Sequence, residues 1–322
     1  MSADGAIAPA AGAKPGADAD AGSAGAAPRA RRLLERRYRF LAETLAPERA
    51  LRIADVGANP INRPDYADLL ELGGCELWGF EPEPKAFAEL QANPRPGAHY
   101  LNVAVGRPGP ARFHLHPQNG LGSLYPIRAE SVAYLGHPGW YRGDADSVEI
   151  TLQSLDEMEE LPPPDMLKID IQGGELDVIR TGRAKLAQAV CIVPEVRFYR
   201  IYEGEPLWGP LDCELHDQGF RLHRIVFSKS VMVANSQQRR LKGKAMRNQL
   251  MDGDAIYIRD PETIAHWSAT QVKHLALVSA TVFDSFDLTV FCLDELVRRG
   301  ELSDAVPGAF VDLLPRWARA GG

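Results

Sequence analysis

Three carboxylates stand at places where a predicted α/β sheet would present them to a ligand. Asp170 lies near the end of the apolar run from 166 to 171, Glu175 begins the helix that follows, and Glu195 ends the run from 190 to 196. Because the carboxyl ends of neighbouring parallel strands meet at one edge of a sheet, we expect these side chains to converge. A carboxylate can take a proton from a hydroxyl group, so the sequence predicts a catalytic general base among them.

Other interpretations of these residues are open. His114 and His116 alternate to one face of a predicted edge strand and are rival bases, although surface histidines on such a strand are the commoner explanation. Glu175 would also interact favourably with the dipole of its own helix. Asp170 and Glu195 are hard oxygen donors suited to Mg²⁺. Paired carboxylates at strand ends more often act without a metal, so we expect no metal ligands and keep Mg²⁺ as the less favoured alternative.

A second set of polar residues and glycines follows three other predicted strands. Gly57 comes directly after the apolar run from 51 to 56 and allows close backbone approach to a ligand. Glu81 is placed to accept both hydroxyls of a ribose, and Asn102 to bond the edge of a purine. These types in this order predict a nucleoside laid across three strand ends. The full predicted cofactor-binding set is Asp55, Gly57, Ala58, Asn59, Glu81, Asn102, Ala104 and Ser123.

The kind of nucleoside follows from the turn after the first strand. A dinucleotide site needs G-x-G-x-x-G, but the turn from 57 to 62 reads GANPIN and holds one glycine. A ligand without phosphates therefore fits better, and S-adenosylmethionine is the common one, with Asp55 and the turn's amides facing its amino-acid end. An NAD(P)-dependent oxidoreductase and a non-catalytic binding module are the alternatives.

Six motifs give the sequence a family resemblance. They are DVGAN, GFEPEP, LNVAVG, GLGSL, LKIDIQGGELDVIRTG and VPEVRFYRIYEG, in order between about Ile53 and Ile225. Together they resemble the FkbM family of S-adenosylmethionine-dependent methyltransferases, and the segment from Lys168 to Glu175 is the most specific. The chain departs from the family pattern at Pro60–Ile61–Asn62, where a second glycine is usual near the helix start.

The resemblance implies a fold and an activity. The fold is α/β, the class I methyltransferase type: an open, mostly parallel seven-stranded sheet with one antiparallel edge strand. The activity is mostly O-methylation of a sugar or polyketide hydroxyl. We expect Asp170 near the transferred methyl group, with Glu175 or Glu195 as the base. The loop from Gly120 to Leu124, which includes Ser123, is expected to wall the cofactor or acceptor.

Pattern divides the chain into four parts. Residues 1–28 are mostly Ala, Gly, Pro and Asp and are expected to be disordered. An N-terminal helix is predicted within 29–48, the methyltransferase domain covers 49–260, and a helical extension covers 261–322. Within the domain, strands are predicted at 51–56, 75–82, 99–105, 111–116, 148–155, 166–171, 190–196, 222–227 and 255–258. Apolar residues from Leu275 to Val297 recur at spacings of three and four without a break.

Composition limits the partners and the location. The net charge of −7 argues against a nucleic-acid binder, and no apolar run is long enough for a membrane span. The N-terminus lacks the features of a signal peptide. The four cysteines are far apart, so reduced thiols in a cytoplasmic protein are expected.

Two segments outside the motifs are assigned to partners. The basic loop from Arg239 to Arg247 is expected to select the acceptor, a small molecule or glycan of anionic type, unless it is only a solvated loop. The C-terminal helices are expected to pack on the sheet, cap the site or form a homodimer. Five arginines of the N-terminal helix could meet a phosphate-rich partner, but a solvated face is the favoured account.

Overall fold

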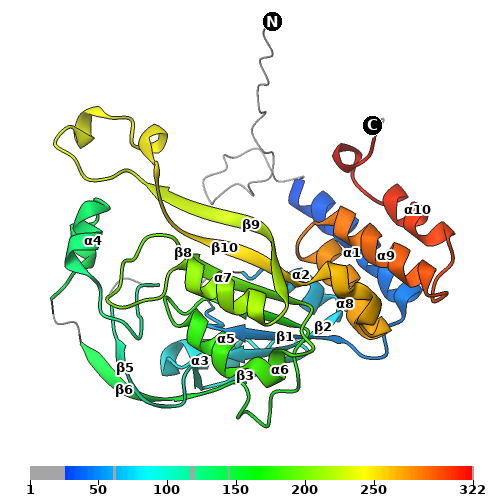
Figure 1. Ribbon diagram of the computed structural model, residues 1–322, viewed down its shortest axis with the longest axis horizontal. Coiled ribbons are helices and arrows are strands. Elements are labelled where there is room, and N and C mark those ends of the chain that lie inside the picture. Colours follow the sequence, from blue (N-terminus) through cyan, green and yellow to red (C-terminus); the bar gives the residue numbers. More distant parts are fainter. Residues whose placement is uncertain (1–25, 61–62, 117–119, 144–145, 321–322) are drawn as a thin grey trace, which may run out of the picture.

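A computed structural model describes residues 26–60, 63–116, 120–143 and 146–320 (Figure 1). Of residues 1–28, which were expected to be disordered, 26–28 are helical and the rest lie outside these described residues. The family departure at Ile61 and Asn62 also lies outside them, as does Asn119 in the glycine-rich loop. None of the described helices is long and apolar enough to cross a membrane.

A seven-stranded sheet forms the centre of the molecule. Its order is β3-β2-β1-β7-β8-β10-β9, and all pairs are parallel except those made by β10. The open, mostly parallel sheet that the resemblance implies is therefore confirmed, with β10 lying one place in from the edge rather than at it. The strands are β1 Leu51–Val56, β2 Cys75–Phe80, β3 Ala98–Leu101, β7 Met166–Ile169, β8 Cys191–Arg197, β9 Phe220–Val231 and β10 Gln249–Arg259.

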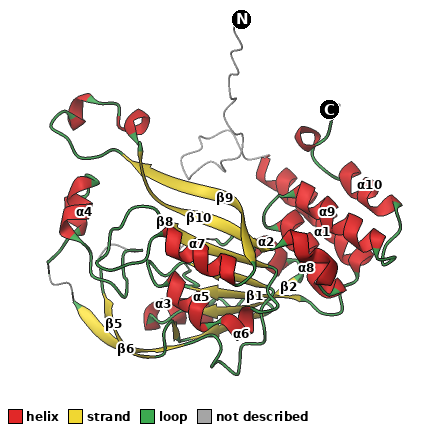
Figure 2. Cartoon of the chain, in the orientation of Figure 1, coloured by secondary structure: helices red, strands yellow, loops and turns green. Residues whose placement is uncertain are grey.

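Helices cover both faces of this sheet, which explains why its central strands are apolar on both sides (Figure 2). Ile53 of β1 faces one core and Ala54 the other. The first core is closed by α1 Ala26–Leu45, α2 Ala67–Glu71, α8 Ala269–Thr281, α9 Phe286–Arg298 and α10 Ala305–Asp312. The second is closed by α5 Glu175–Thr181, α6 Arg183–Leu186 and α7 Trp208–Asp217. The predicted N-terminal helix and C-terminal helices are thus present, and the C-terminal helices pack on the sheet.

The unbroken apolar pattern near the C-terminus forms two helices rather than one. Between α8 and α9 the chain turns at Asp284, whose φ is +50°. The Asp284 carboxylate accepts a hydrogen bond of 3.0 Å from the guanidinium of Arg37 on α1. Apolar spacing alone cannot reveal such a turn, because both helices face the same core.

A small second sheet lies beside the main one. It has the order β4-β6-β5, from β4 Ala104–Val105, β5 Gly109–His114 and β6 Ser147–Gln153. The single strand predicted over 99–105 is therefore wrong. Pairing with β2 ends at Leu101 and the chain crosses to the second sheet at Ala104, because the Asn102 side chain is bonded to the end of β2.

Strands β9 and β10 are much longer than predicted and form a projecting hairpin. The outer residues of β9 are mostly exposed, and those of β10 include the polar residues Gln249, Asp252 and Asp254, so no apolar run marks either extension. We call residues 232–248, which join them, the arm. It contains the short helical turns η2 Gln238–Arg240 and η3 Gly243–Met246. In Figure 1 the arm and the C-terminal helices lie at opposite ends of the molecule.

Five further short elements complete the described chain: α3 Pro84–Ala92, α4 Ala129–Tyr134, η1 Pro138–Trp140, η4 Pro261–His266 and η5 Arg316–Ala318. They add cover without changing the strand order.

A buried carboxylate ties the sheet to the C-terminal helices. Asp165 precedes β7 and accepts two hydrogen bonds from Arg49, at 2.5 and 2.8 Å, and one from the backbone N–H of Arg52. Nδ1 of His274 on α8 lies 3.0 Å from its Oδ1. Although burial opposes the charge, these partners lower the pKa of Asp165 to about 2.

Candidate active site

The turn after β1 brings three strand ends together. Gly57 has φ of +89°, and its N–H and that of Ala58 both donate to the carbonyl of Phe80 at the end of β2. The N–H of Asp170, after β7, donates to the carbonyl of Val56. A Cβ at Gly57 would lie 2.2 Å from the Asp170 carbonyl oxygen, so only glycine fits. Asn59 continues this turn, with its N–H bonded to the Gly57 carbonyl.

Asp55 is buried beneath this turn rather than open above it. Its carboxylate accepts a 2.5 Å hydrogen bond from the Tyr66 hydroxyl and lies 3.3 Å from Lys168 Nζ. Burial opposes the charge of Lys168, but Asp55 and Asp170 together raise its pKa to about 12. Lys168 therefore lies among the carboxylates of the site. Its charge offsets theirs.

Glu81 and Asn102 lie at the neighbouring strand ends, as predicted. Glu81 is buried, and one of its oxygens accepts from the N–H of Glu83 at 2.8 Å. Burial raises its pKa. The amide nitrogen of Asn102 donates to the carbonyls of Glu81 and Pro82, so its carbonyl oxygen is the group it can offer a ligand. Ala104 is buried in β4.

A cavity of about 370 Å³ opens beside Asp170, and we call it the acidic cavity. Four carboxylates reach it, and Arg197 and Lys229 are its cationic residues. Asp170 is exposed there, whereas Glu195 is largely enclosed. The lining residues are Gly120, Leu121, Trp140, Asp170, Gln172, Glu195, Arg197, Ile201, Phe227, Lys229, Met251, Asp252, Gly253 and Asp254.

Three carboxylates of the acidic cavity have raised pKa values. Burial is the largest cause of a raised pKa at Glu195, Asp252 and Asp254. The charge of Asp170 adds to it, and the pKa of Asp254 reaches about 6. The pKa of Glu195 lies well above its usual range even though Arg197 lowers it. Several groups in one cavity therefore exchange protons closer to neutral pH than ordinary carboxylates do.

Gln172 bridges the two predicted catalytic carboxylates at the strand ends. Its amide nitrogen donates to Asp170 Oδ1 at 3.1 Å and to Glu195 Oε2 at 2.9 Å. Its carbonyl oxygen accepts from Arg197 at 3.1 Å and from the Tyr202 hydroxyl at 3.3 Å. The residue has φ of +59°, a conformation that is costly for a side chain other than glycine. Four hydrogen bonds hold it there.

Arg197, which the sequence reading left without a role, is the centre of a buried charge network. Its guanidinium lies 3.1 Å from Glu195, 3.1 Å from Asp252 and 3.3 Å from Glu205. Burial alone would lower the pKa of Arg197, but these carboxylates raise it above its ordinary value. The sequence did contain a feature that points to this network, because an arginine between Val196 and Phe198 at the end of a buried strand requires anionic partners.

Two predicted site residues, Glu175 and Ser123, make hydrogen bonds to the protein's own backbone. The Glu175 carboxylate turns back and accepts from the N–H groups of Ile171 and Gly173 at 3.0 to 3.1 Å. The Ser123 hydroxyl is fully buried and donates to the Gln172 carbonyl at 2.6 Å. Both contacts support the turn that carries Asp170 and Gln172. Their geometry suits a supporting role, and a direct role in catalysis or cofactor binding stays a prediction.

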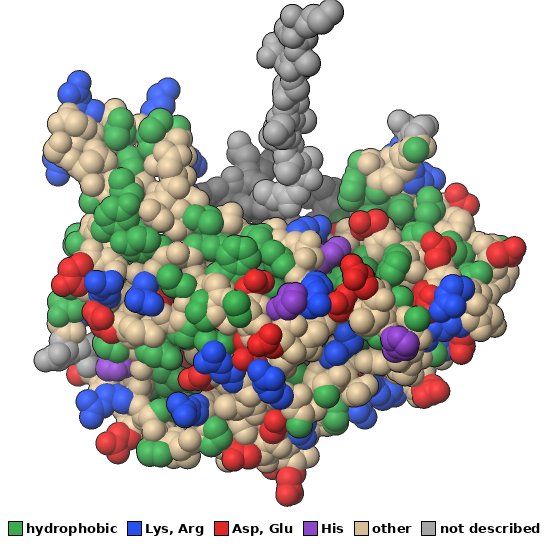
Figure 3. Space-filling model, viewed as in Figure 1, with side chains coloured by type: hydrophobic (Ala, Val, Ile, Leu, Met, Phe, Trp, Pro, Cys, Tyr) green, Lys and Arg blue, Asp and Glu red, His purple; other side chains and the backbone are tan. Residues whose placement is uncertain are grey.

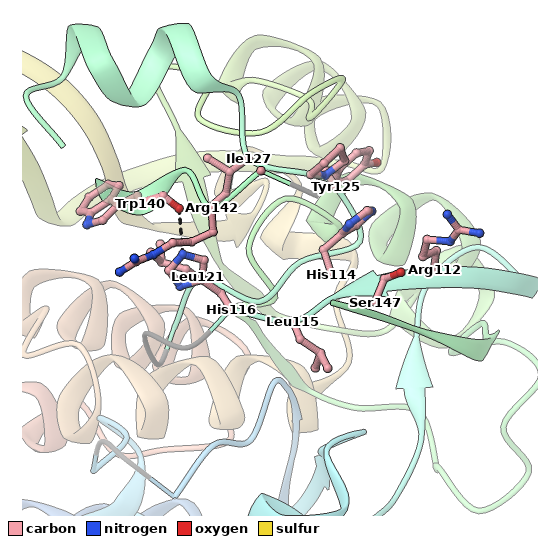
Figure 4. Close-up of a pocket in the computed structure, with 12 residues that line it drawn as sticks. Arg112, His114, Leu115, His116, Leu121, Tyr125, Ile127, Trp140, Arg142 and Ser147 are labelled. Atoms are coloured by element: carbon pink, nitrogen blue, oxygen red, sulfur yellow. Dashed lines mark hydrogen bonds between the residues drawn. The ribbon is translucent and has the colours of Figure 1, made fainter. Parts of the chain in front are cut away.

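The rival histidines lie in a separate, smaller cavity of about 190 Å³ (Figure 4). His116 Nε2 lies 2.8 Å from the carbonyl oxygen of Trp140, and burial lowers the pKa of His114. Leu121 and Trp140 line both cavities. The histidines are therefore neither simple surface residues nor part of the acidic cavity. In the part of the chain that the structure describes, no group of three or more His, Cys, Asp or Glu side chains is arranged to hold a metal ion.

Comparison with known proteins decides the family. The model of the methyltransferase FkbM domain matches residues 55–222, more than half of the chain. The chain belongs to the FkbM family of S-adenosylmethionine-dependent methyltransferases. It is also 31% identical over 173 residues to the 2-O-methyltransferase NoeI of Sinorhizobium fredii, covering 50% of this chain and 69% of the relative.

Solved structures provide distant likenesses. Magnesium protoporphyrin IX methyltransferase from Synechocystis PCC 6803 is 12% identical, with 72% of this chain and 80% of that chain covered and a TM-score of 0.31. The O-methyltransferase of a polyketide synthase multienzyme from Brevibacillus brevis is 9% identical, with 85% of each chain covered and a TM-score of 0.34. We base the fold of the FkbM domain on its strand order and not on these likenesses.

Proposed function

We propose that this FkbM protein transfers the methyl group of S-adenosylmethionine to a hydroxyl group of a neutral sugar, glycan or secondary metabolite. One observation carries the proposal. The Gly57 turn and the acidic cavity meet at Asp170, whose carbonyl faces Gly57 and whose side chain lines the cavity. The O-methylating relative supports the choice of a hydroxyl acceptor.

The residues around Gly57 fit the cofactor. Gly57 lets the turn after β1 pack directly on the Asp170 backbone, which brings the ends of β1 and β7 together, and Glu81 provides a carboxylate for ribose hydroxyls at the next strand end. When bound, S-adenosylmethionine supplies a methyl group on a positively charged sulfur. Lining up the acceptor oxygen with that methyl group can account for about 7–11 kcal/mol of the barrier.

We assign the proton acceptor to Asp170. Among the predicted bases it is the exposed one, with a 3.1 Å hydrogen bond from Gln172 orienting its carboxylate. Glu195 is the second choice, because its raised pKa favours the protonated form over a wider pH range. Glu175 is the third, since backbone N–H groups occupy its oxygens. A positioned base contributes about 10²–10⁴-fold to such a reaction.

The charge of the acidic cavity argues for a neutral acceptor. Asp170, Glu195, Asp252 and Asp254 outnumber the two cationic residues that line it. None of the five cations between Arg239 and Arg247 lines either cavity described above. The anionic acceptor expected from the sequence is therefore not part of this proposal, and neither is selection of the acceptor by the basic loop.

Location and assembly belong to the proposal as well. All four cysteines are free thiols, three of them buried, which supports a reducing compartment such as the cytoplasm. Phe291 and Trp317, on and beyond α9, are exposed apolar side chains that support a homodimer through the C-terminal helices. Sedimentation equilibrium tests the dimer.

A calorimetric titration tests the cofactor. We expect heat with S-adenosylhomocysteine and none with NADH. The opposite result would favour an oxidoreductase, and no heat with either ligand would favour a non-catalytic module. Mass spectrometry of glycan and metabolite extracts incubated with S-adenosylmethionine then identifies the methylated product.

Glu81→Ala tests the nucleoside side of the site. Loss of a charged partner for the ribose should weaken S-adenosylhomocysteine binding by about 10- to 100-fold. Glu83→Ala is the matched control, because it removes a neighbouring carboxylate but keeps the backbone N–H that bonds Glu81. Equal dissociation constants for the two variants would remove Glu81 from the cofactor site.

A further inference from the structure

Strand β9 and the arm form a strongly basic segment in an acidic protein. From 218 to 251 the chain contains eight Lys and Arg residues and no Asp or Glu, although the net charge of the whole chain is −7. Five of these cations fall within the arm: Arg239, Arg240, Lys242, Lys244 and Arg247. The positive charge is therefore concentrated at one end of the molecule.

The cations of the arm have no acidic partner. All five residues are exposed, and none pairs with a carboxylate anywhere in the described chain. Two arginines of α1 contrast with them: Arg31 pairs with Glu71 at 2.8 Å, and Arg37 pairs with Asp284. Figure 3 shows the blue side chains of the tip with no red ones beside them. Such a surface attracts an external anion.

Apolar side chains are interleaved with these cations. Leu241 lies between Arg240 and Lys242 and is 41% exposed, and Met246 lies next to Arg247 and is 40% exposed. Basic side chains mixed with exposed apolar ones suit the boundary between lipid headgroups and acyl chains. A small soluble anion would use the charges but not Leu241 or Met246.

The shape of the arm also favours an extended partner. It projects from the body as a hairpin tip, and its five cations line neither described cavity, so nothing on it encloses a small ligand (Figure 1). We propose that the arm docks this protein on an anionic lipid membrane, with its cations at the headgroups and Leu241 and Met246 inserted. This interaction goes beyond the methyl transfer proposed above and does not depend on it.

Docking through the arm would orient the acidic cavity relative to the membrane. Phe227 and Lys229 of β9 and Met251 and Asp252 of β10 line the cavity where the two strands of the same hairpin approach the arm. Two antiparallel strands therefore lead from the tip to the cavity. An acceptor held at a membrane surface would be reached from that side.

Vesicle co-sedimentation with the full chain tests the proposal. We expect binding to phosphatidylcholine vesicles that contain one third phosphatidylserine, much weaker binding to pure phosphatidylcholine, and loss in high salt. The triple variant Arg239→Ser, Arg240→Ser, Lys242→Ser should lower the partition coefficient by about a hundredfold, at about fivefold for each charge. Leu241→Ser with Met246→Ser should weaken binding at low salt, because the inserted side chains are lost while all five charges remain.

The control carries the same change in net charge at another place. Arg32→Ser, Arg36→Ser, Arg39→Ser removes three exposed arginines of α1 and should leave vesicle binding unchanged. S-adenosylhomocysteine binding should be the same in both triple variants, which separates this test from that of the methyltransferase site. Equal losses in the two variants would overturn the proposal. So would binding to heparin or an oligonucleotide without binding to anionic vesicles.

Discussion

Asp170 differs from the other carboxylates of the acidic cavity in its surroundings. Arg197 neutralises Glu195 and Asp252 directly, whereas Asp170 is exposed and takes a hydrogen bond from an uncharged amide. A substrate hydroxyl in the cavity can therefore reach the Asp170 carboxylate. This is why the base is assigned to a residue that makes few contacts.

Asp170→Asn should separate chemistry from binding. The substitution preserves shape but removes the proton acceptor, so kcat should fall by about 10²–10⁴-fold. The dissociation constant of S-adenosylhomocysteine, measured by calorimetry, should stay the same. Asp217→Asn, at an exposed position on α7, is the control. Turnover comparable to that of the control would exclude Asp170 as the base.

Gln172 is a positioning residue whose backbone and side chain can be tested separately. Gln172→Gly and Gln172→Ala both remove the bridge between Asp170 and Glu195, so kcat should fall by about 10- to 100-fold in each. Glycine tolerates φ of +59° and alanine does not, so the glycine variant should be the more stable by about 1 kcal/mol in urea.

A third substitution at this position separates positioning from simple loss of structure. Gln172→Glu places a charge beside Asp170 and Glu195, which should move the acid limb of the pH–rate profile upward. An unchanged profile in Gln172→Glu, or full activity in Gln172→Ala, would contradict the positioning role.

The site residues that could be predicted from the sequence are those that follow buried strands. Gly57, Glu81 and Asp170 each follow an apolar run, and parallel strands bring such positions to one edge. The same rules do not give the direction of a side chain. Arg197 and Lys168 join carboxylates from other strands, and the Glu175 carboxylate turns to its own loop, so their contacts depend on packing that one sequence does not display.

At the scale of elements, predictions succeeded where burial on both faces leaves an apolar run. Strands β1, β2, β7 and β8 are of this kind. Two features were missed because they carry no such pattern: the crossing between β3 and β4, which a side-chain bond of Asn102 fixes, and the polar length of β9 and β10. The four-part division of the chain stays a prediction.

Asp165→Asn should loosen the attachment of the C-terminal helices. The neutral amide cannot pair with Arg49 and loses the neighbouring His274, so the free energy of unfolding should fall by roughly 2–3 kcal/mol. This loss is smaller than the loss expected for a fully buried ion pair, because Arg49 is partly exposed to solvent. Urea denaturation gives the measurement, and Asp156→Asn, at a surface site, is the control. A loss of unfolding free energy equal to that of the control would contradict the role of Asp165 in attaching the C-terminal helices to the sheet.

For the whole molecule, two buried carboxylates give opposite pH dependence. The pKa of Asp165 in the folded state is about 2, below its ordinary value of 3.8, so this group stabilises the fold above about pH 4 and that contribution is lost as the pH falls toward 2. The pKa of Asp254 is about 6 in the folded state, so the fold binds this proton better than the unfolded chain does. Through Asp254, stability rises as the pH falls from about 6 to about 4.

Asp254→Asn should isolate the second effect. At neutral pH the variant avoids burying a charge, so it should be more stable than the natural protein by up to about 2–3 kcal/mol. The difference should shrink toward zero as the pH falls to about 4. Urea midpoints measured across this range check the sign, and a gap that widens on acidification would refute it.

Strand β10 connects the arm to the wall of the acidic cavity. One end leaves the arm, and Asp252, Gly253 and Asp254 further along it form part of the cavity wall. A Cβ at Gly253 would lie 2.4 Å from the Phe227 carbonyl oxygen, so the two strands of the hairpin fit closely at that point. The arm and one wall of the acidic cavity are therefore parts of the same hairpin, so the direction in which the tip is held also determines the direction in which that wall faces.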